Sequence, residues 1–292
     1  MTAENEILKT IEYHLNKKII SQQPLSGGCI SDSSIIQTSS GNKYFLKVNH
    51  NVPSDMFTKE ANGLKEIEYS KSIRVPSVEL AGDNFILMEC IEGKTKSKNF
   101  FKDFGIQFAK MHKYECSYYG FHEDNYIGST VQKNISDEEE RNNWIKFYFN
   151  KRLLFQFKLA ESNGYIDSEF RKCFNRIENK IENILDSEAD KPSLLHGDLW
   201  AGNYIVDENG RACLIDPAVY YGNREADLAM TKLFGGFTQV FYNSYNEFYQ
   251  LNEGYEYREN IYKLYHVFNH LNLFGGGYYQ QALSLIKFYG SS

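Results

Sequence analysis

Two short apolar runs joined by a turn place the strongest constraint on this chain. Residues 204–206 (Tyr-Ile-Val) are followed by the turn Asp-Glu-Asn-Gly and by a second apolar run that ends at Ile215. Short apolar runs around an Asn-Gly turn predict a β-hairpin. Asn203 precedes the first strand and Asp216 follows the second, so antiparallel pairing should bring these two side chains close together, with Asp198 just upstream.

An amide between two carboxylates is typical of phosphoryl-transfer sites. Oxygen ligands of this kind are those that Mg²⁺ prefers, and protein kinases use the pattern H-R-D-x-x-x-x-N followed by D-F-G. Here Gly197 takes the place of the Arg, and Asp-Pro-Ala replaces Asp-Phe-Gly. An aspartate in a turn most often only bonds its own backbone. The spacing and the hairpin nevertheless favour a kinase-like site at Asp198, in a chain that is otherwise unlike a protein kinase.

The composition narrows the classes of protein to which this chain can belong. With 292 residues, of which 42% are hydrophobic, the chain can form one large domain or two lobes. A formal net charge of −6 argues against nonspecific nucleic-acid binding. The acidic N-terminus is unlike a signal peptide, and no stretch approaches the ~18 apolar residues of a membrane span. Five scattered cysteines predict neither a zinc site nor a disulfide framework. We therefore expect a cytoplasmic protein with reduced thiols.

The first third of the chain predicts a small sheet. A helix over residues 3–17 precedes three strand-like runs, which two turn-rich clusters separate into an antiparallel meander. Lys47 in the third run alternates with apolar neighbours, so its ammonium should point away from the core. Gly27 and Gly28 lie about 20 residues earlier, as a phosphate loop does in a kinase N-lobe, and can let backbone amides approach phosphates. An ordinary hairpin turn is the alternative for this glycine pair.

The helix predicted over residues 53–70 offers a partner for Lys47. Glu60 borders the apolar face of this helix and is favoured over Glu66 and Glu68. A Lys–Glu pair of this kind aims the ammonium at the α- and β-phosphates of a nucleotide.

Two further strands, over residues 75–80 and 85–90, complete the predicted sheet. The second leads through Glu89, Cys90 and Ile91 into a glycine-containing linker. A kinase-type hinge offers its backbone N–H and C=O groups to adenine at this position. We place the lobe boundary here, so that residues 1–91 form a nucleotide-binding lobe and residues 92–292 a catalytic and substrate-binding lobe.

The second lobe is predicted to be mostly helical, and the tract at 129–137 is predicted to be a loop. The fold class is therefore α+β and bilobal, with a five-stranded antiparallel sheet and a helix in the first lobe, as in protein kinases. The predicted helices cover residues 101–112, 138–163, 168–185, 225–234, 244–251 and a final pair within 259–289.

Three further segments are typical of one family. They are YGFHEDNYIG at 119–128, the run DPAVYYGNREADLA that begins at Asp216, and LYHVFNHLNLFGGGY at 264–278. Together with LLHGDLWAGN, Gly-Gly-Cys-Ile and residues 144–159, they make the chain resemble the fructosamine kinase (ketosamine-3-kinase) family from about residue 10 to 289. The wider group, which resembles aminoglycoside and choline kinases, shares only the Asp198, Asn203 and Asp216 part.

The resemblance implies a reaction. ATP with Mg²⁺ would phosphorylate the 3-hydroxyl of the sugar part of a ketosamine, either free or on a glycated protein, and loss of the phosphate would then free the amine. Matched residue by residue, Asp198 would accept the hydroxyl proton, while Asn203 and Asp216 would hold Mg²⁺. Lys47 would contact phosphate, and residues 89–91 would line the adenine site.

The remaining candidates each have two interpretations. Trp200 is either a core residue or a platform for the ketosamine, because an indole face suits sugar C–H bonds and an ammonium. Asn125 and His270, with their neighbours Tyr126 and Asn272, are pocket residues or packing residues. Cys29 matches a family cysteine associated with redox-sensitive dimerisation, so the chain is expected to be a monomer or such a homodimer. The alternative for Cys29 is a small buried hydrophobe.

Two other functions stay open on the sequence alone. One is a kinase of the same superfamily that acts on another small-molecule hydroxyl, and the other is a catalytically inactive nucleotide-binding protein. Competent side chains at Lys47, Glu60, Asp198, Asn203 and Asp216 argue against the second. Ribulosamine, erythrulosamine and fructosamine adducts are equally plausible substrates.

Overall fold

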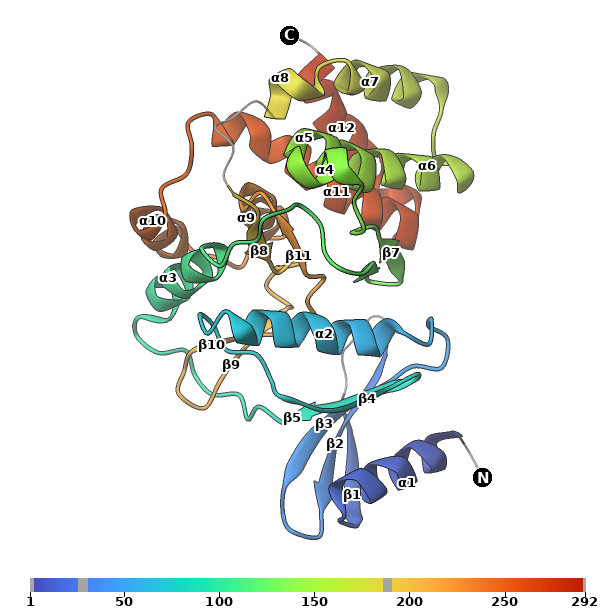
Figure 1. Cartoon of the computed structure of the whole chain (residues 1–292), viewed down its shortest axis with the longest axis vertical. Helices are drawn as coiled ribbons and strands as arrows, with labels where there is room; N and C mark the ends of the chain where they lie inside the picture. The colour runs from blue at the N-terminus through green and yellow to red at the C-terminus, as the bar shows by residue number, and fades with distance from the viewer. Residues whose placement is uncertain (1–2, 26–30, 186–190, 291–292) are drawn as a thin grey trace. The chain divides into compact units, whose positions relative to one another are not determined.

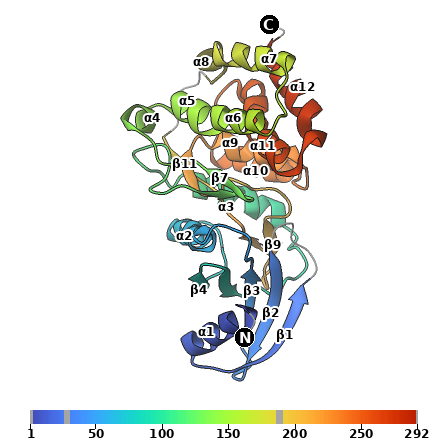
Figure 2. The ribbon, with the colours of Figure 1, turned by 90° about the vertical axis from the view of Figure 1, so that its right-hand side faces the viewer.

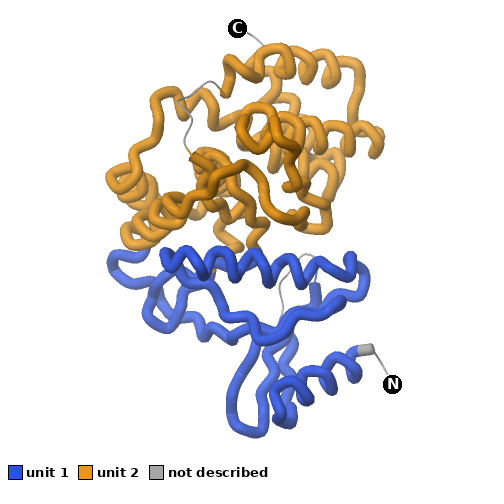
Figure 3. Tube along the Cα trace, viewed as in Figure 1, with its two compact units in different colours: residues 1–100, 205–216 blue, residues 101–204, 217–292 orange. Residues whose placement is uncertain are grey.

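The computed structural model describes residues 3–25, 31–185 and 191–290. The chain forms two compact units, shown in Figure 3. The sheet unit comprises Met1–Phe100 and Ile205–Asp216, and the helical unit comprises Phe101–Tyr204 and Pro217–Ser292. This grouping differs from a single boundary near residue 92, because the Leu214 N–H donates to the Arg74 carbonyl and the Ser97 N–H to that of Gly210, which ties the hairpin to the sheet unit.

The sheet unit contains the expected five-stranded antiparallel sheet, in the order β1-β2-β3-β5-β4. Its strands are β1 (Ile19–Leu25), β2 (Asp32–Thr38), β3 (Lys43–Val48), β4 (Val78–Gly82) and β5 (Phe85–Glu89). Helix α1 (Ala3–Leu15) precedes the sheet and α2 (Met56–Tyr69) connects β3 to β4, as Figure 1 shows. The predicted strands and helices of this unit are all present, within a few residues of their expected ends.

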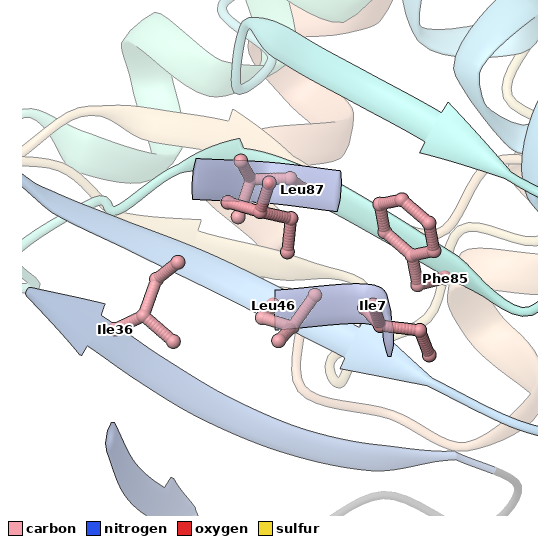
Figure 4. Packing of buried hydrophobic residues seen from close by; sticks show 6 residues of the cluster. Ile7, Ile36, Leu46, Phe85 and Leu87 are labelled. Carbon is pink, nitrogen blue, oxygen red and sulfur yellow. The ribbon is translucent and has the colours of Figure 1, made fainter. Parts of the chain in front are cut away.

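Alternation along β3 gives the sheet two different faces. Leu46 is fully buried in a cluster with Ile7 of α1, Ile36 of β2, and Phe85 and Leu87 of β5 (Figure 4). Its neighbour Lys47 therefore projects from the opposite face.

Helix α2 lies on that opposite face, where it packs against β4 and β5 (Figure 2). Its buried residues recur at helical spacing and include Phe57, Ala61, Leu64 and Ile67.

The sequence-predicted hairpin is formed by β9 (Tyr204–Val206) and β10 (Ala212–Leu214). Its turn is closed by the Asp207 N–H, which donates to the Arg211 carbonyl at 2.8 Å. Gly210 adopts a φ of +72° there, a conformation that favours glycine. An added Cβ at Gly210 would also lie 2.9 Å from the backbone nitrogen of Ser97.

The helical unit is built around the long helix α11 (Tyr255–Phe274), which packs against α6 (Phe155–Ser162), α9 (Glu225–Leu233) and α12 (Tyr279–Gly290). Two short strands, β8 (Ser193–Leu195) and β11 (Tyr220–Gly222), pair antiparallel within it. The remaining helices of this unit are α3 (Phe100–His112, whose first residue belongs to the sheet unit), α4 (Glu138–Asn142), α5 (Trp144–Tyr148), α7 (Ser168–Glu178), α8 (Ile181–Leu185) and α10 (Gln239–Phe248).

Several expected boundaries in the helical unit were wrong. The helix expected over 138–163 is broken at Asn143, which is extended and whose side chain caps α5 by accepting from the Lys146 N–H at 3.0 Å. A π-helical turn, η1 (Phe149–Leu154), then separates α5 from α6. The helix expected over 168–185 is divided into α7 and α8.

The tract at 129–137 is not only a loop. It contains β7 (Thr130–Gln132), which pairs with β6 (Asn125–Ile127). These three-residue strands are shorter than the runs from which alternation can be recognised. Within the described residues, no helix has the length and apolarity needed to cross a membrane.

Candidate functional site

The sheet unit brings three of the predicted site residues together around one ammonium group. Lys47 Nζ lies 3.0 Å from both carboxylate oxygens of Glu60 and 2.9 Å from Oδ1 of Asp216. Glu60, and not Glu66 or Glu68, is therefore the partner of Lys47. Lys47 belongs to β3 and Glu60 to α2, and Asp216 is the second residue after the end of β10.

Burial and the neighbouring charges act in opposite directions on the pKa values of Lys47 and Glu60. Burial alone would lower the pKa of Lys47, but the two carboxylates raise it above its ordinary value, so the lysine stays charged. Burial, with repulsion from Asp216, raises the pKa of Glu60 in spite of Lys47. Asp216 is the most accessible member, with 44% of its side chain exposed, and its φ of +53° is one that aspartate tolerates better than most residues. An exposed carboxylate beside a fixed ammonium suits a site for a phosphate group and its cation.

The predicted hinge follows β5 in the same unit. The Glu89 carboxylate accepts from Arg74 at 2.6 Å and from the Ser77 N–H at 3.2 Å, so its side chain is engaged within the protein. Cys90 is half-buried, and burial, the largest effect on this thiol, raises its pKa. The Glu89 N–H is also engaged, because it donates to the Ser77 carbonyl at 2.9 Å, so only the backbone of residues 90 and 91 is left for the predicted role in adenine binding.

Arg74 is a positioning residue that the sequence did not reveal. Its guanidinium contacts three carboxylates, those of Glu89 at 2.6 Å, Asp207 at 3.0 Å and Glu208 at 2.7 Å. It therefore ties the hinge to the hairpin that leads to Asp216. No local pattern distinguishes this arginine, because its partners are up to 134 residues away.

We expect Arg74→Met to lower stability by about 1–3 kcal/mol and to raise the KM for ATP, because three carboxylates lose their shared counter-ion while the side-chain length is kept. Thermal unfolding and ATP titration measure both effects. Arg211→Met is the matched control, since it removes an exposed arginine from the same hairpin. Equal behaviour of the two variants would contradict the positioning role of Arg74.

The helical unit holds the other two predicted residues of the motif. Asn203 Nδ2 donates to the Asp198 carbonyl at 2.8 Å and to its Oδ2 at 3.2 Å. Asp198 is half-buried in the loop after β8, and the Asn203 N–H closes the loop onto the Trp200 carbonyl. The amide nitrogen of Asn203 thus orients Asp198. The amide oxygen of Asn203 is of the kind that binds Mg²⁺.

Gly197 explains why this loop lacks the arginine of protein kinases. Its φ is +82°, and an added Cβ would lie 2.0 Å from the Ala218 carbonyl oxygen. The same backbone approach allows the Ala218 N–H to donate to the His196 carbonyl at 2.8 Å. No side chain larger than hydrogen fits at position 197.

Asp227 of α9 holds the start of this loop. Its carboxylate accepts from the backbone N–H groups of His196 at 2.7 Å and Gly197 at 2.8 Å. His112 Nε2 lies 3.2 Å from the same carboxylate, and His112 Nδ1 lies 2.7 Å from the Tyr245 hydroxyl. Burial alone would raise the pKa of Asp227, but His112 and the backbone donors hold it below its ordinary value. An acid within the apolar run Ala-Asp-Leu-Ala was the available sequence signal for this role.

Asp227→Asn should destabilise the protein by about 2–4 kcal/mol, because a buried carboxylate that accepts several hydrogen bonds loses its charge. A depressed carboxyl pKa stabilises the fold above the ordinary value of 3.8, and this contribution is lost as the pH falls below that value. Denaturant titrations across pH should therefore show wild type and variant converging in acid. Asp103→Asn, at an exposed position on α3, is the control; a pH-independent difference would contradict a role for the Asp227 charge.

The proposed substrate residues divide into two groups. Trp200 is 38% exposed, and its ring centroid lies 6.2 Å from that of Phe234, which is 43% exposed. Phe234 in turn lies 4.9 Å from His270. These three rings form an aromatic cluster in which Trp200 and Phe234 are exposed and His270 is half-buried. Trp200 follows Asp198 by two residues in the sequence. The indole also lies over Gly202, where an added Cβ would come within 2.3 Å of the ring.

Asn125 and Asn272 are engaged inside the protein. The Asn125 amide donates to the Val219 carbonyl at 2.7 Å, and its oxygen accepts from Gln132 at 2.9 Å. The Asn272 amide donates to the side chain of Gln156 at 2.7 Å. Both side chains therefore hold segments of the helical unit together. Gly27, Gly28 and Cys29 lie outside the described residues.

Comparison with known proteins shows to which family this chain belongs. The model of the family described as fructosamine kinase matches residues 3–290. The chain belongs to the fructosamine kinase family. A probable ketoamine kinase of Enterococcus faecium is 37% identical over 94% of this chain and 95% of its own. The protein-ribulosamine 3-kinase of Arabidopsis thaliana is 38% identical over 91% of this chain and 81% of its own.

Solved structures agree with the expected fold. A putative fructosamine-3-kinase from Thermobifida fusca superposes with a TM-score of 0.88 at 25% identity, and the match covers 99% of both chains. An ADP-bound aminoglycoside phosphotransferase gives a TM-score of 0.62 at 18% identity, over 99% of both chains, which concerns the fold alone. This chain therefore has the bilobal, kinase-like α+β fold that the sequence predicted.

Proposed function

We propose that the protein is an ATP-dependent kinase that phosphorylates the 3-hydroxyl of ketosamines. The observation that carries the proposal is the hydrogen-bonded pair of Asp198 and Asn203, which retains the base and the amide of a phosphoryl-transfer loop. The sheet unit retains the matching Lys47–Glu60 ion pair. The named activities of two relatives, ketoamine kinase and protein-ribulosamine 3-kinase, support the choice of acceptor.

Asp198 is proposed to accept the proton of the attacking 3-hydroxyl. Asn203 fixes its carboxylate through a hydrogen bond, and Asp227 fixes the backbone immediately before it. Such positioning contributes more to phosphoryl transfer than covalent participation does. Lys47, held charged by Glu60 and Asp216, is proposed to bind the nucleotide phosphates.

Asn203 and Asp216 are the proposed Mg²⁺ ligands. One carboxylate and one amide oxygen form the hard donor set that Mg²⁺ takes in nucleotide sites, where substrate phosphates complete its coordination. The accessible carboxylate of Asp216 and the orientation of the Asn203 amide by Asp198 fit this role. When bound, the ion neutralises charge on the transferring phosphoryl group.

Trp200 is the proposed platform for the sugar and its ammonium. Its exposed indole face and the neighbouring Phe234 offer an electron-rich surface, which attracts cations and suits C–H bonds. After phosphorylation at O3, loss of a C1 proton expels the phosphate with its electron pair, and hydrolysis of the resulting adduct frees the amine. This sequence would make the protein a deglycating enzyme.

A substrate panel tests the proposal. The purified protein with ATP and Mg²⁺ should release ADP with ribulose-, erythrulose- or fructose-lysine and not with choline or kanamycin. A 3-deoxy ketosamine is the matched negative control, because it lacks only the acceptor oxygen. Preferential turnover of choline or kanamycin, or full turnover of the 3-deoxy analogue, would contradict the proposed acceptor.

A further inference from the structure

The hairpin of β6 and β7 carries two buried carboxamides that have no part in the chemistry proposed above. Asn125 and Gln132 are direct cross-strand partners in this hairpin, whose second strand is labelled in Figure 1. They are only 4% and 1% exposed. Side chains at such paired positions are neighbours, and the Gln132 amide donates to the Asn125 side-chain oxygen at 2.9 Å. The two carboxamides therefore form one hydrogen-bonded unit.

This carboxamide pair holds two successive backbone carbonyls. The Gln132 amide donates to the Ala218 carbonyl at 2.8 Å, and the Asn125 amide donates to the Val219 carbonyl at 2.7 Å. The side-chain oxygen of Gln132 accepts from the Tyr265 hydroxyl at 2.8 Å. Both N–H groups and the oxygen of Gln132 thus have partners, and a satisfied buried amide of this kind is fixed in one orientation.

Ala218 is the residue against which the start of the catalytic loop packs. Its N–H donates to the His196 carbonyl at 2.8 Å. Its carbonyl oxygen is the atom that excludes a side chain at Gly197, because an added Cβ there would lie 2.0 Å from it. The Ala218 peptide thus packs against the two residues before Asp198, and its carbonyl is the group that Gln132 holds.

Arg152 connects the carboxamide pair to the π-helical turn η1. The Asn134 amide donates to the Asn125 oxygen at 2.8 Å, and the Arg152 guanidinium donates to the Asn134 oxygen at 2.7 Å. Arg152 is fully buried. Its hydrogen-bond partners in the described part of the chain are this oxygen and the backbone carbonyls of residues 133 and 151, not a carboxylate. A charge buried without an opposite charge costs stability, so stability alone does not account for this arginine.

We propose that Gln132 is a positioning residue for the general base Asp198, and that it acts by holding the Ala218 peptide against which Gly197 packs. Asp227 anchors the same loop through its N–H groups, and Gln132 adds an anchor through the neighbouring peptide. Phosphoryl transfer depends on such positioning, because small displacements of a catalytic group are costly. The inference rests on the proposed function, which supplies the hydroxyl that Asp198 deprotonates.

Hydrogen exchange tests the anchor without any substrate. Gln132→Met keeps the approximate shape of the side chain but removes its three hydrogen bonds. Exchange at the amides of residues 196–198 should become roughly 3- to 10-fold faster relative to that of α12, the worth of one hydrogen bond. An unchanged exchange rate at 196–198 relative to α12 would overturn the proposal.

Gln156→Met is the matched control, because it removes another fully buried carboxamide from the helical unit. The Gln156 side chain donates to Asn269 at 3.1 Å and accepts from Asn272 at 2.7 Å. This variant should lose comparable stability without a selective increase of exchange at residues 196–198. A selective increase equal to that of Gln132→Met would overturn the proposal.

Turnover of ribulose-lysine separates positioning from a general loss of stability. Gln132→Met should lower kcat by about tenfold or more and leave the KM for ATP within about twofold of wild type, whereas Gln156→Met should keep the wild-type kcat. In an Asp198→Asn background the exchange at Gln132 should lower kcat by less than about twofold, because the base through which it acts is already absent. The same tenfold loss in that background would overturn the proposal.

Gln132→Asn is a second variant, which keeps a polar side chain and is used if Gln132→Met does not fold. Its amide is one methylene too short to reach the Ala218 carbonyl, so it should reproduce both the faster exchange and the lower kcat. Wild-type values of both quantities would contradict the role of Gln132. Absence of ketosamine turnover in wild type would refute the proposed function alone, because hydrogen exchange still decides whether Gln132 anchors the loop.

Discussion

Asp198→Asn is expected to reduce kcat by about 10²- to 10⁴-fold, because the general base is lost. The substituted amide keeps the shape of the side chain and an oxygen that can still accept from Asn203. Nucleotide affinity in Mg²⁺ should therefore stay close to that of wild type, since Lys47, Asn203 and Asp216 are unchanged. Steady-state kinetics and ATP titration measure the two quantities on the same preparation.

The matched control is Asp83→Asn, which removes an exposed aspartate from the turn between β4 and β5. It should retain wild-type kcat. Activity of Asp198→Asn within about tenfold of wild type would contradict its assignment as the base, since general-base catalysis contributes more than this.

Asp216→Asn should produce the second large effect, a loss of Mg²⁺-dependent nucleotide binding and of turnover. Removal of the charge weakens the proposed metal site, and asparagine is suited to the φ of +53° at this position, so the backbone should keep its conformation. We expect kcat to fall by about 10²-fold or more, the scale of an electrostatic contribution to catalysis.

Titration of ATP with Mg²⁺ and again with EDTA distinguishes lost metal binding from a general defect. The affinity should fall in Mg²⁺ and change much less in EDTA. An equal loss in both conditions, or a lowered melting temperature, would show that Asp216 acts through the structure of the sheet unit. Asp216→Ala is the less suitable variant, because alanine is strained at positive φ.

The features that the sequence predicted depend on short-range patterns. Alternation along β3 placed Leu46 in the core and Lys47 on the opposite face, and the position of Glu60 beside the apolar face of α2 identified the partner of Lys47. The hairpin followed from a turn sequence between two apolar runs. Each inference needed only a few neighbouring residues, for which strand and helix periodicity is a sufficient guide.

The features that were missed depend on contacts between distant segments. Arg74 contacts its carboxylate partners only because the sheet unit folds distant segments together. Asp227 likewise accepts from the backbone before Asp198 only because of the position of α9. The division of the expected helix at 138–163 reflects capping by Asn143, which competes with a helical pattern that continues on both sides. The engagement of Asn125 by Gln132 likewise arises from strand pairing in segments too short to predict.

The position of the transferred phosphate tests the central claim most directly. Ribulose-lysine labelled with ¹³C at C3 would be incubated with the protein, ATP and Mg²⁺, and followed by ¹³C and ³¹P NMR. We predict a new phosphate ester coupled to the labelled C3, which then decays as inorganic phosphate and free lysine appear together. A phosphate ester at any other carbon, or ADP formation without a phosphorylated ketosamine, would contradict the assignment.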